Sequence, residues 1–182
     1  MRQRSSARSR GPVVAALLLI GACVWPLSSY AAPRQPATRT ATFQATYTGT
    51  LLIGKTPFVS TRTGRGTAST LGRSSLVSSD RAVHMFRNDP QAKCLAVIGE
   101  GALRIASGDQ VKFLYLLGAC GLYPGLRYAP SGHYIIYGGS GKFAGAHGRG
   151  TFRETGILNL GAPGDASPIT DTFSGTLTLP AR

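Results

Sequence analysis

The sequence predicts an all-β protein, namely a small closed antiparallel β-barrel of about eight strands that follows an N-terminal signal peptide. Apolar and polar residues alternate with a period of two along several segments, which is typical of half-buried strands. No convincing helix follows the leader. The chain has 24 glycines among 182 residues, and they recur inside the alternating segments, where each would cost a helix roughly 1 kcal/mol relative to alanine. A long sheet with glycines at inward positions curls and closes, which favours a barrel over a two-sheet sandwich.

The first 31 residues are interpreted as a secretory signal peptide. Four arginines precede an apolar run over residues 13–27, and small residues follow at Ser29 and Ala31. This order of positive, apolar and small residues is that of a signal peptide, and the run is too short to be a good membrane span. We therefore expect a secreted protein, periplasmic or extracellular, without a transmembrane segment in the mature chain. Lipoprotein anchoring through Cys23 is the alternative, and the apolar residues after that cysteine argue against it.

The mature chain divides into a flexible lead-in over residues 32–40 and a barrel domain over residues 41–182. The lead-in is rich in proline, threonine and arginine and shows no apolar periodicity, so no strand is expected there. Cleavage after Ala31 leaves sixteen basic and seven acidic residues, a formal charge of +9. The predicted mature chain is therefore still strongly basic.

The strands of the barrel domain are read from alternation and from turn residues. In the first strand, Phe43, Tyr47 and Leu51 share one face. The segment 110–119 is apolar enough to be a helix, but Gly108 and Gly118 at its ends favour a strand. The remaining predicted strands cover residues 64–72, 74–86, 94–98 together with 101–106 (as two short strands or one broken strand), 134–137, 142–153 and 170–179.

A glycine-rich hairpin over residues 134–153 carries the one family resemblance in the chain. Its sequence, YIIYGGSGKFAGAHGRGTFR, has glycines at Gly138, Gly139, Gly141, Gly145, Gly148 and Gly150. This pattern resembles the penultimate hairpin of secreted bacterial proteins with allene-oxide-cyclase-like or dirigent-like barrels. The closing segment 171–177, DTFSGTL, resembles their last strand. The resemblance implies the barrel fold and makes a dimer or trimer plausible. The functional acidic and basic groups of those enzymes align with no residue here, so no catalytic residue is carried over.

Two cysteines remain in the mature chain, Cys94 and Cys120. An even number of cysteines in an exported protein favours one disulfide. Two free buried thiols are the alternative.

The sequence contains no motif for phosphate, dinucleotide or metal binding. Phe143 stands where a phosphate-binding loop needs serine or threonine, and no cysteine or histidine pair has ligand spacing. We therefore expect no metal, no cofactor and no catalytic residue. Three acidic residues lie within or beside predicted strands, and an unpaired carboxylate is expensive to bury. An outward, solvated position is therefore expected for Asp80, Glu100 and Asp171.

The favoured function is non-enzymatic binding, either of a small apolar or aromatic ligand inside the barrel or of an envelope partner. Barrels of about eight strands hold packed side chains or one small ligand. Two alternatives are an enzyme of the cyclase or dirigent type, which steers a reactive intermediate, and a purely structural surface protein. The candidate ligand-binding residues are Phe113, Tyr115, Tyr134 and Tyr137.

The basic charge suggests a further class of partner. Arginines and lysines are scattered along the chain, without the basic stripe and interleaved aromatics of a nucleic-acid module. Specific nucleic-acid binding is therefore not expected. General attraction to an anionic envelope surface or an acidic polysaccharide is the physical expectation.

Overall fold

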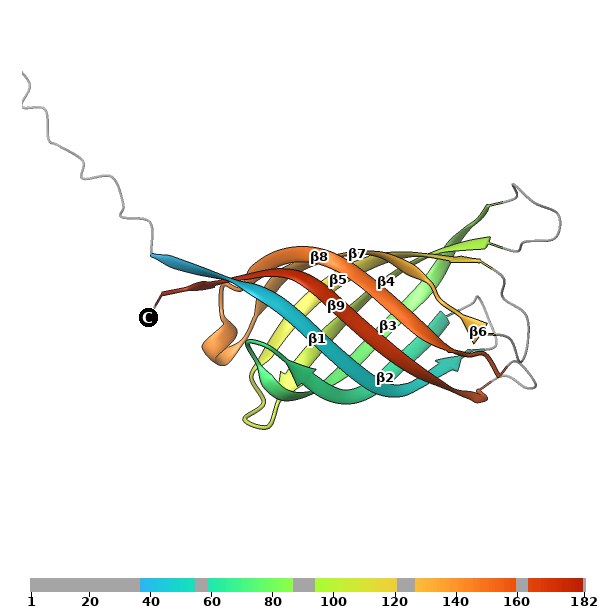
Figure 1. Ribbon diagram of the computed structural model, residues 1–182, viewed down its shortest axis with the longest axis horizontal. Coiled ribbons are helices and arrows are strands. Elements are labelled where there is room, and N and C mark those ends of the chain that lie inside the picture. Colours follow the sequence, from blue (N-terminus) through green and yellow to red (C-terminus); the bar gives the residue numbers. More distant parts are fainter. Residues whose placement is uncertain (1–36, 55–58, 87–93, 121–126, 160–163, 182) are drawn as a thin grey trace, which may run out of the picture. The chain divides into compact units, whose positions relative to one another are not determined.

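The computed structural model of the chain describes residues 37–54, 59–86, 94–120, 127–159 and 164–181, with the side chains of residues 84–86 excepted. The predicted signal peptide, Cys23 and most of the predicted lead-in lie outside the described residues. Residues 38–40, the end of that lead-in, already belong to the first strand, so the boundary expected at residue 41 is three residues too late. The described residues belong to one compact unit, residues 35–182. Its architecture is a closed antiparallel β-barrel of eight strands, so the predicted fold class is confirmed (Figure 1).

Apart from the two-residue strand β6, each strand pairs with the next one along the chain, and the last strand pairs with the first. The two-residue strand β6 extends the sheet beside the end of β8, and β8 pairs with β9. A single 3₁₀ turn, η1, joins β7 to β8. The bounds are β1 Thr38–Ile53, β2 Val59–Ala68, β3 Gly72–Phe86, β4 Cys94–Ile105, β5 Gln110–Cys120, β6 Arg127–Tyr128, β7 Ser131–Gly139, η1 Gly141–Phe143, β8 His147–Ile157 and β9 Ala166–Pro180.

The alternation in sequence becomes an alternation between the inside and the outside of the barrel. In β1, Phe43, Ala45, Tyr47 and Leu51 are buried, and the alternate residues 44, 46, 48 and 50 are exposed or half-buried, as predicted. Strand β5 alternates in the same way, which confirms a strand where hydrophobicity alone allowed a helix. The predicted break near Gly99 is absent, because β4 runs on through this glycine as one strand.

The glycine-rich segment forms the β7–η1–β8 hairpin. Gly141 and Gly145 have positive φ angles of 58° and 76°, a conformation that other residues rarely adopt. Gly138 and Gly139 lie at the end of β7, and Gly148 and Gly150 lie within β8. The predicted hairpin is confirmed, with a 3₁₀ turn in place of a simple tight turn.

Stacked aromatic rings fill the middle of the barrel. Phe173 is their centre: its ring lies 4.6 Å from that of Phe152, 5.2 Å from Phe113 and 5.4 Å from Tyr134. Edge-to-face and stacked pairs of this kind stabilise a core beyond the effect of burial alone. Burial raises the pKa of Tyr134 to about 12, so its hydroxyl stays protonated within this core.

The two ends of the barrel differ. The β2–β3, β4–β5 and β7–β8 turns lie at one end, where β1 begins and β9 ends; we call it the hairpin end (Figure 1). The opposite end is where β1, β3, β5 and β8 finish. Cys94 begins β4 and Cys120 ends β5 there, so we call it the disulfide end.

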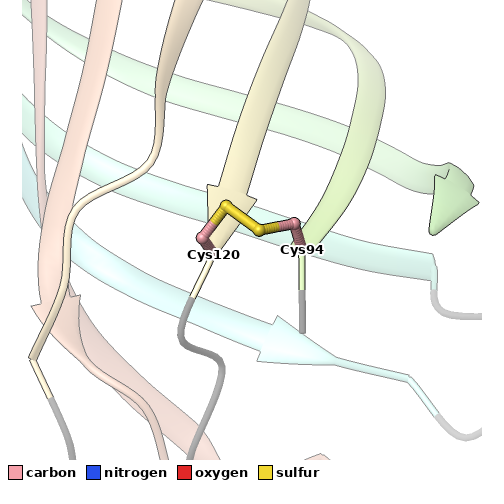
Figure 2. The surroundings of a disulfide bond; sticks show 2 residues. All are labelled: Cys94 and Cys120. Atoms are coloured by element: carbon pink, nitrogen blue, oxygen red, sulfur yellow. A yellow bond between two sulfur atoms is a disulfide. The ribbon is translucent and has the colours of Figure 1, made fainter. Parts of the chain in front are cut away.

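The predicted cysteine pair is supported by the strand register. Cys94 and Cys120 lie directly opposite each other, and their sulfur atoms are 2.08 Å apart, at bonding distance (Figure 2). Disulfides are typical of exported proteins, so the pair is consistent with export, while secretion itself stays a prediction. In the part of the chain that the structure describes, no helix is long and apolar enough to cross a membrane.

Candidate functional site

Five polar side chains from five strands meet inside the barrel, toward the disulfide end. They are almost completely buried, with exposed fractions between 0% and 5%. Polar groups at such depth need partners, because desolvation of an unpaired charge is costly. We call this group the charged cluster, and its members are Arg62 of β2, Asp80 of β3, Tyr115 of β5, Glu154 of β8 and Asp171 of β9.

Arg62 bridges the two sides of the charged cluster. Its Nη1 forms an ion pair with Asp80, and its Nε donates a hydrogen bond to Glu154 Oε2. The same Nη1 donates to the hydroxyl of Tyr115 at 2.8 Å. Burial by itself lowers the pKa of Arg62, but the negative charge of Glu154, with smaller contributions from Tyr115 and Asp171, outweighs it and raises that pKa. The arginine therefore holds its charge against burial.

Tyr115 fixes the position of Asp80. Its hydroxyl donates to Asp80 Oδ2 at 2.8 Å and lies 3.3 Å from Ser78 Oγ. The other oxygen of this carboxylate, Oδ1, accepts a hydrogen bond from Ser60. Burial raises the pKa of Tyr115, and the positive charge of Arg62 partly opposes this. Asp80 therefore has hydrogen-bond donors on both of its oxygens.

A glycine makes room for this arrangement. Gly99 of β4 is buried and faces the interior. A Cβ atom at this position would collide with the ring of Tyr115 and with Asp80. The glycine in the middle of β4 therefore allows the tyrosine to reach across and contact the carboxylate.

Glu154 and Asp171 form a carboxyl pair across neighbouring strands. They lie directly opposite each other in the β8–β9 register. Burial raises the pKa of Asp171 to about 8, aided by the negative charge of Glu154 and a hydrogen bond with it, and opposed by Arg62. Two like charges this close resist simultaneous ionisation. Asp171 therefore keeps its proton at neutral pH.

Two oxygens of this pair have no hydrogen-bond partner among the described residues. They are Glu154 Oε1 and Asp171 Oδ1, and both are buried. A buried acceptor without a donor costs roughly 1–3 kcal/mol, and more if it is charged. The charged cluster thus satisfies Asp80 fully and leaves the Glu154–Asp171 pair with open acceptor positions.

An apolar patch lies beside this pair at the disulfide end. It is made of Leu51, Tyr128, Leu158 and Ile169, all buried. Leu51 is opposite Arg62 in the β1–β2 register, and Ile169 is two residues before Asp171 on the same face of β9. The charged cluster therefore lies between this apolar patch and the aromatic core.

The structure separates the four candidate ligand-binding residues. Phe113, Tyr115 and Tyr134 face the interior. Phe113 and Tyr134 pack in the aromatic core, and Tyr115 belongs both to that core, through its ring, and to the charged cluster, through its hydroxyl. Tyr137 is 50% exposed, so it lies on the outer surface and contributes nothing to an interior site.

The outward position expected for Asp80 and Asp171 is wrong, while that of Glu100 is confirmed. The first two are buried because Arg62, Tyr115 and a retained proton offset the cost that argued against burial. Arg62 and Glu154 were not predicted. Glu154 could have been found, because it lies two residues after the core residue Phe152. Arg62 has only polar and small neighbours on its face of β2, so it gave no such signal.

No group of three histidine, cysteine, aspartate or glutamate side chains within the described ranges is arranged to hold a metal ion. In the charged cluster, Arg62 occupies the position between Asp80 and Glu154 where a cation would otherwise lie. The arrangement instead suits hydrogen bonding to a small molecule, or proton transfer by the Glu154–Asp171 pair.

Compared with protein-family models, with curated proteins and with solved structures, the chain matches none. The resemblance to cyclase-like and dirigent-like barrels therefore rests on the quoted residues and remains a prediction.

Proposed function

We propose that this β-barrel binds a small organic molecule at the charged cluster, at the disulfide end of its interior. The observation that carries the proposal is the pair of buried oxygens without donors, Glu154 Oε1 and Asp171 Oδ1. A ligand that donates hydrogen bonds to them removes the cost of leaving them unpaired. The aromatic core occupies the middle of the barrel, which favours a ligand held at one end.

The chemistry of the surroundings suggests the class of ligand. Three carboxyl groups face one arginine, so the charged cluster favours a positively charged group over an anion. The neighbouring apolar patch suits a small aliphatic or aromatic body. We therefore propose a small apolar or aromatic amine, whose ammonium group donates to Glu154 and Asp171.

Thermal unfolding with a matched pair of probes tests this proposal. The mature chain, residues 32–182, is heated with benzylamine or with benzyl alcohol. These two share a ring, and only the first carries a positive charge. At ten times its Kd a ligand stabilises by about 1.4 kcal/mol, which raises Tm by roughly 3–6 °C for a chain of this size. Benzylamine is expected to give this rise and benzyl alcohol a smaller one.

The control variants separate the site from general charge attraction. Glu154→Gln, which removes the ionised carboxylate, is expected to abolish the rise with benzylamine, and Asp171→Asn, which prevents this residue from ionising beside the ammonium group, is expected to reduce it. Glu100→Gln, which neutralises an exposed carboxylate, keeps the rise. The proposal is wrong if benzylamine leaves Tm unchanged, or if all three variants respond as the unmodified chain does.

Acid–base catalysis is a second candidate, favoured by the raised pKa of Asp171 beside Glu154. A protonated and an ionised carboxyl group side by side are the pair that general acid–base catalysis uses. A cyclase-type enzyme needs such groups together with a shaped interior. In this candidate, Glu154 accepts a proton from a bound molecule and Asp171 donates one.

An elimination reaction that is catalysed by a general base tests this second candidate. In 5-nitrobenzisoxazole, a base removes the ring C–H proton, the N–O bond breaks, and coloured 2-cyano-4-nitrophenolate forms. Catalysis is expected for the unmodified chain and for Glu100→Gln, and is lost in Glu154→Gln. Equal rates for the unmodified chain and Glu154→Gln would exclude Glu154 as a general base toward this probe.

A further inference from the structure

The barrel distributes its charges unequally between inside and outside. Of the six carboxylates in the described ranges, three are buried in the charged cluster. Of the eleven arginines and lysines in the same ranges, ten are exposed, and Arg62 is the exception. The outer surface is therefore more basic than the net charge of the chain indicates, and this surface attracts polyanions.

Three of the exposed arginines surround one open hollow at the hairpin end, of about 670 Å³. Arg65 of β2 lies opposite Ser75 of β3, and Ser75 lies opposite Arg104 of β4. Arg73 lies two residues before Ser75, on the same outward face of β3, and its side chain is exposed. Directly opposed strand residues are about 5 Å apart, so three positive charges gather within a few residue spacings.

The lining of the hollow suits an anion. It contains these three arginines together with serine and threonine hydroxyls, and no carboxylate. Arg104 is held in place, because its Nε and Nη2 donate to Gln110 Oε1 at 3.2 Å and 3.1 Å. Arg65 and Arg73 have no carboxylate partner in the part of the chain that is described. Their guanidinium groups therefore remain available for carboxylate or sulfate groups.

We propose that this arginine hollow, formed by Arg65, Arg73 and Arg104, binds an acidic polysaccharide. Arginine forks pair with the charged groups of such a chain, and the hydroxyls of Thr67 and Ser75 bond its sugar hydroxyls. No aromatic side chain lines the hollow to stack a base, and Ile105, its one large apolar residue, packs against the core rather than projecting outward. These two features favour a polysaccharide over a nucleic acid or a membrane. The inference is independent of the proposed function, because the charged cluster lies at the other end of the barrel.

Binding to polygalacturonate, measured by calorimetry, tests the proposal. The buffer contains about 0.15 M salt, where the Debye length is about 8 Å, so scattered surface charges are largely screened. The triple variant Arg65→Gln/Arg73→Gln/Arg104→Gln is compared with Arg81→Gln/Arg149→Gln/Arg153→Gln, which removes the same charge from exposed positions elsewhere. The first is expected to raise Kd at least tenfold and the second less than threefold. Neutral dextran is expected not to bind.

Three outcomes overturn the proposal. Equal weakening by the two triple variants would mean diffuse charge attraction without a site. Binding to vesicles of anionic phosphatidylglycerol, or to single-stranded DNA, more tightly than to polygalacturonate would assign the hollow to another class of partner. If the unmodified chain does not bind polygalacturonate at all, the proposal is wrong. If the triple variant does not fold, as judged by circular dichroism, the single variants Arg73→Gln and Arg149→Gln are compared instead. Arg73→Gln is expected to raise Kd more than Arg149→Gln, and the reverse order would contradict the proposal.

Discussion

Arg62 is the residue on which the interior of the barrel depends most. It is the one described arginine that is buried, and it contacts two carboxylates and a tyrosine from three other strands. Its guanidinium also lies over the ring of Tyr115, 5.5 Å from the ring centre. The planar fork and permanent charge of arginine suit such a position better than lysine does.

Replacement of Arg62 by methionine is expected to be strongly destabilising. It removes the positive charge and leaves Asp80 and Glu154 buried without an ionic partner, which costs roughly 3–5 kcal/mol in comparable cases. Arg65→Met, an exposed change on the same strand, is expected to stay within about 0.5 kcal/mol. Urea unfolding of both variants gives the two free energies. Similar small decreases in the free energy of unfolding of both variants would show that the charged cluster does not stabilise the fold.

The sequence could have predicted more of the charged cluster than it did. Asp80 alternates in phase with the core residue Leu76, and Asp171 with Phe173, so the period of two already placed both inside. The expectation of solvent exposure came from the cost of an unpaired charge. In the fold, Arg62 lies between Asp80 and Glu154 and offsets this cost. In the sequence, Arg62 stands 18 positions before Asp80 and 92 before Glu154, so the cost could not be judged from the sequence.

At the scale of elements, the strands were predictable because their signals are local. Alternation and turn glycines mark each strand, and β5 follows them although its hydrophobicity also allows a helix. The strand register could not be predicted, because it depends on contacts between distant residues. The barrel closes through fifteen opposed residue pairs between β1 and β9, from Thr38 opposite Pro180 to Leu52 opposite Ala166. No local pattern in either strand specifies that pairing.

The disulfide is expected to stabilise the β4–β5 pair at the end that carries the charged cluster. The two cysteines are 26 residues apart in sequence, and a loop of that length corresponds to about 3 kcal/mol in the chain-entropy treatment. The variant Cys94→Ser/Cys120→Ser is therefore expected to unfold at lower urea concentration than the oxidised protein. The reduced unmodified chain should match the variant, which provides the control. An unchanged midpoint on reduction would contradict a stabilising role for the bond.

At the scale of the whole molecule, closure of the barrel buries three of the six described acidic residues and leaves ten of the eleven described basic residues outside. The charged cluster combines Asp171 and Glu154 with Arg62, Asp80 and Tyr115, which all face the same interior. The folded protein therefore binds protons differently from the unfolded chain. The pH dependence of stability therefore reports on the interior.

Stability is expected to fall as the pH rises from about 4 to about 8. Asp171 has a pKa of about 8 in the folded protein, against roughly 3.9 when unfolded. Between these values the folded state binds the extra proton, so the free energy of unfolding decreases as the pH rises. Asp171→Asn, which cannot ionise, is expected to lack this decrease and to exceed the unmodified chain in stability above pH 8. Urea unfolding across the pH range checks this; parallel curves for the two proteins would contradict it.

The most direct test of the charged cluster is a carbon-13 NMR titration of the side-chain carboxyl groups in a chain of residues 32–182. One aspartate signal is expected to titrate near pH 8, to be absent in Asp171→Asn, and to move to lower pH in Glu154→Gln, because the negative charge beside it is removed. If every carboxyl group instead titrates below about pH 5, Asp171 and Glu154 are not buried side by side, and the candidate site described above does not exist.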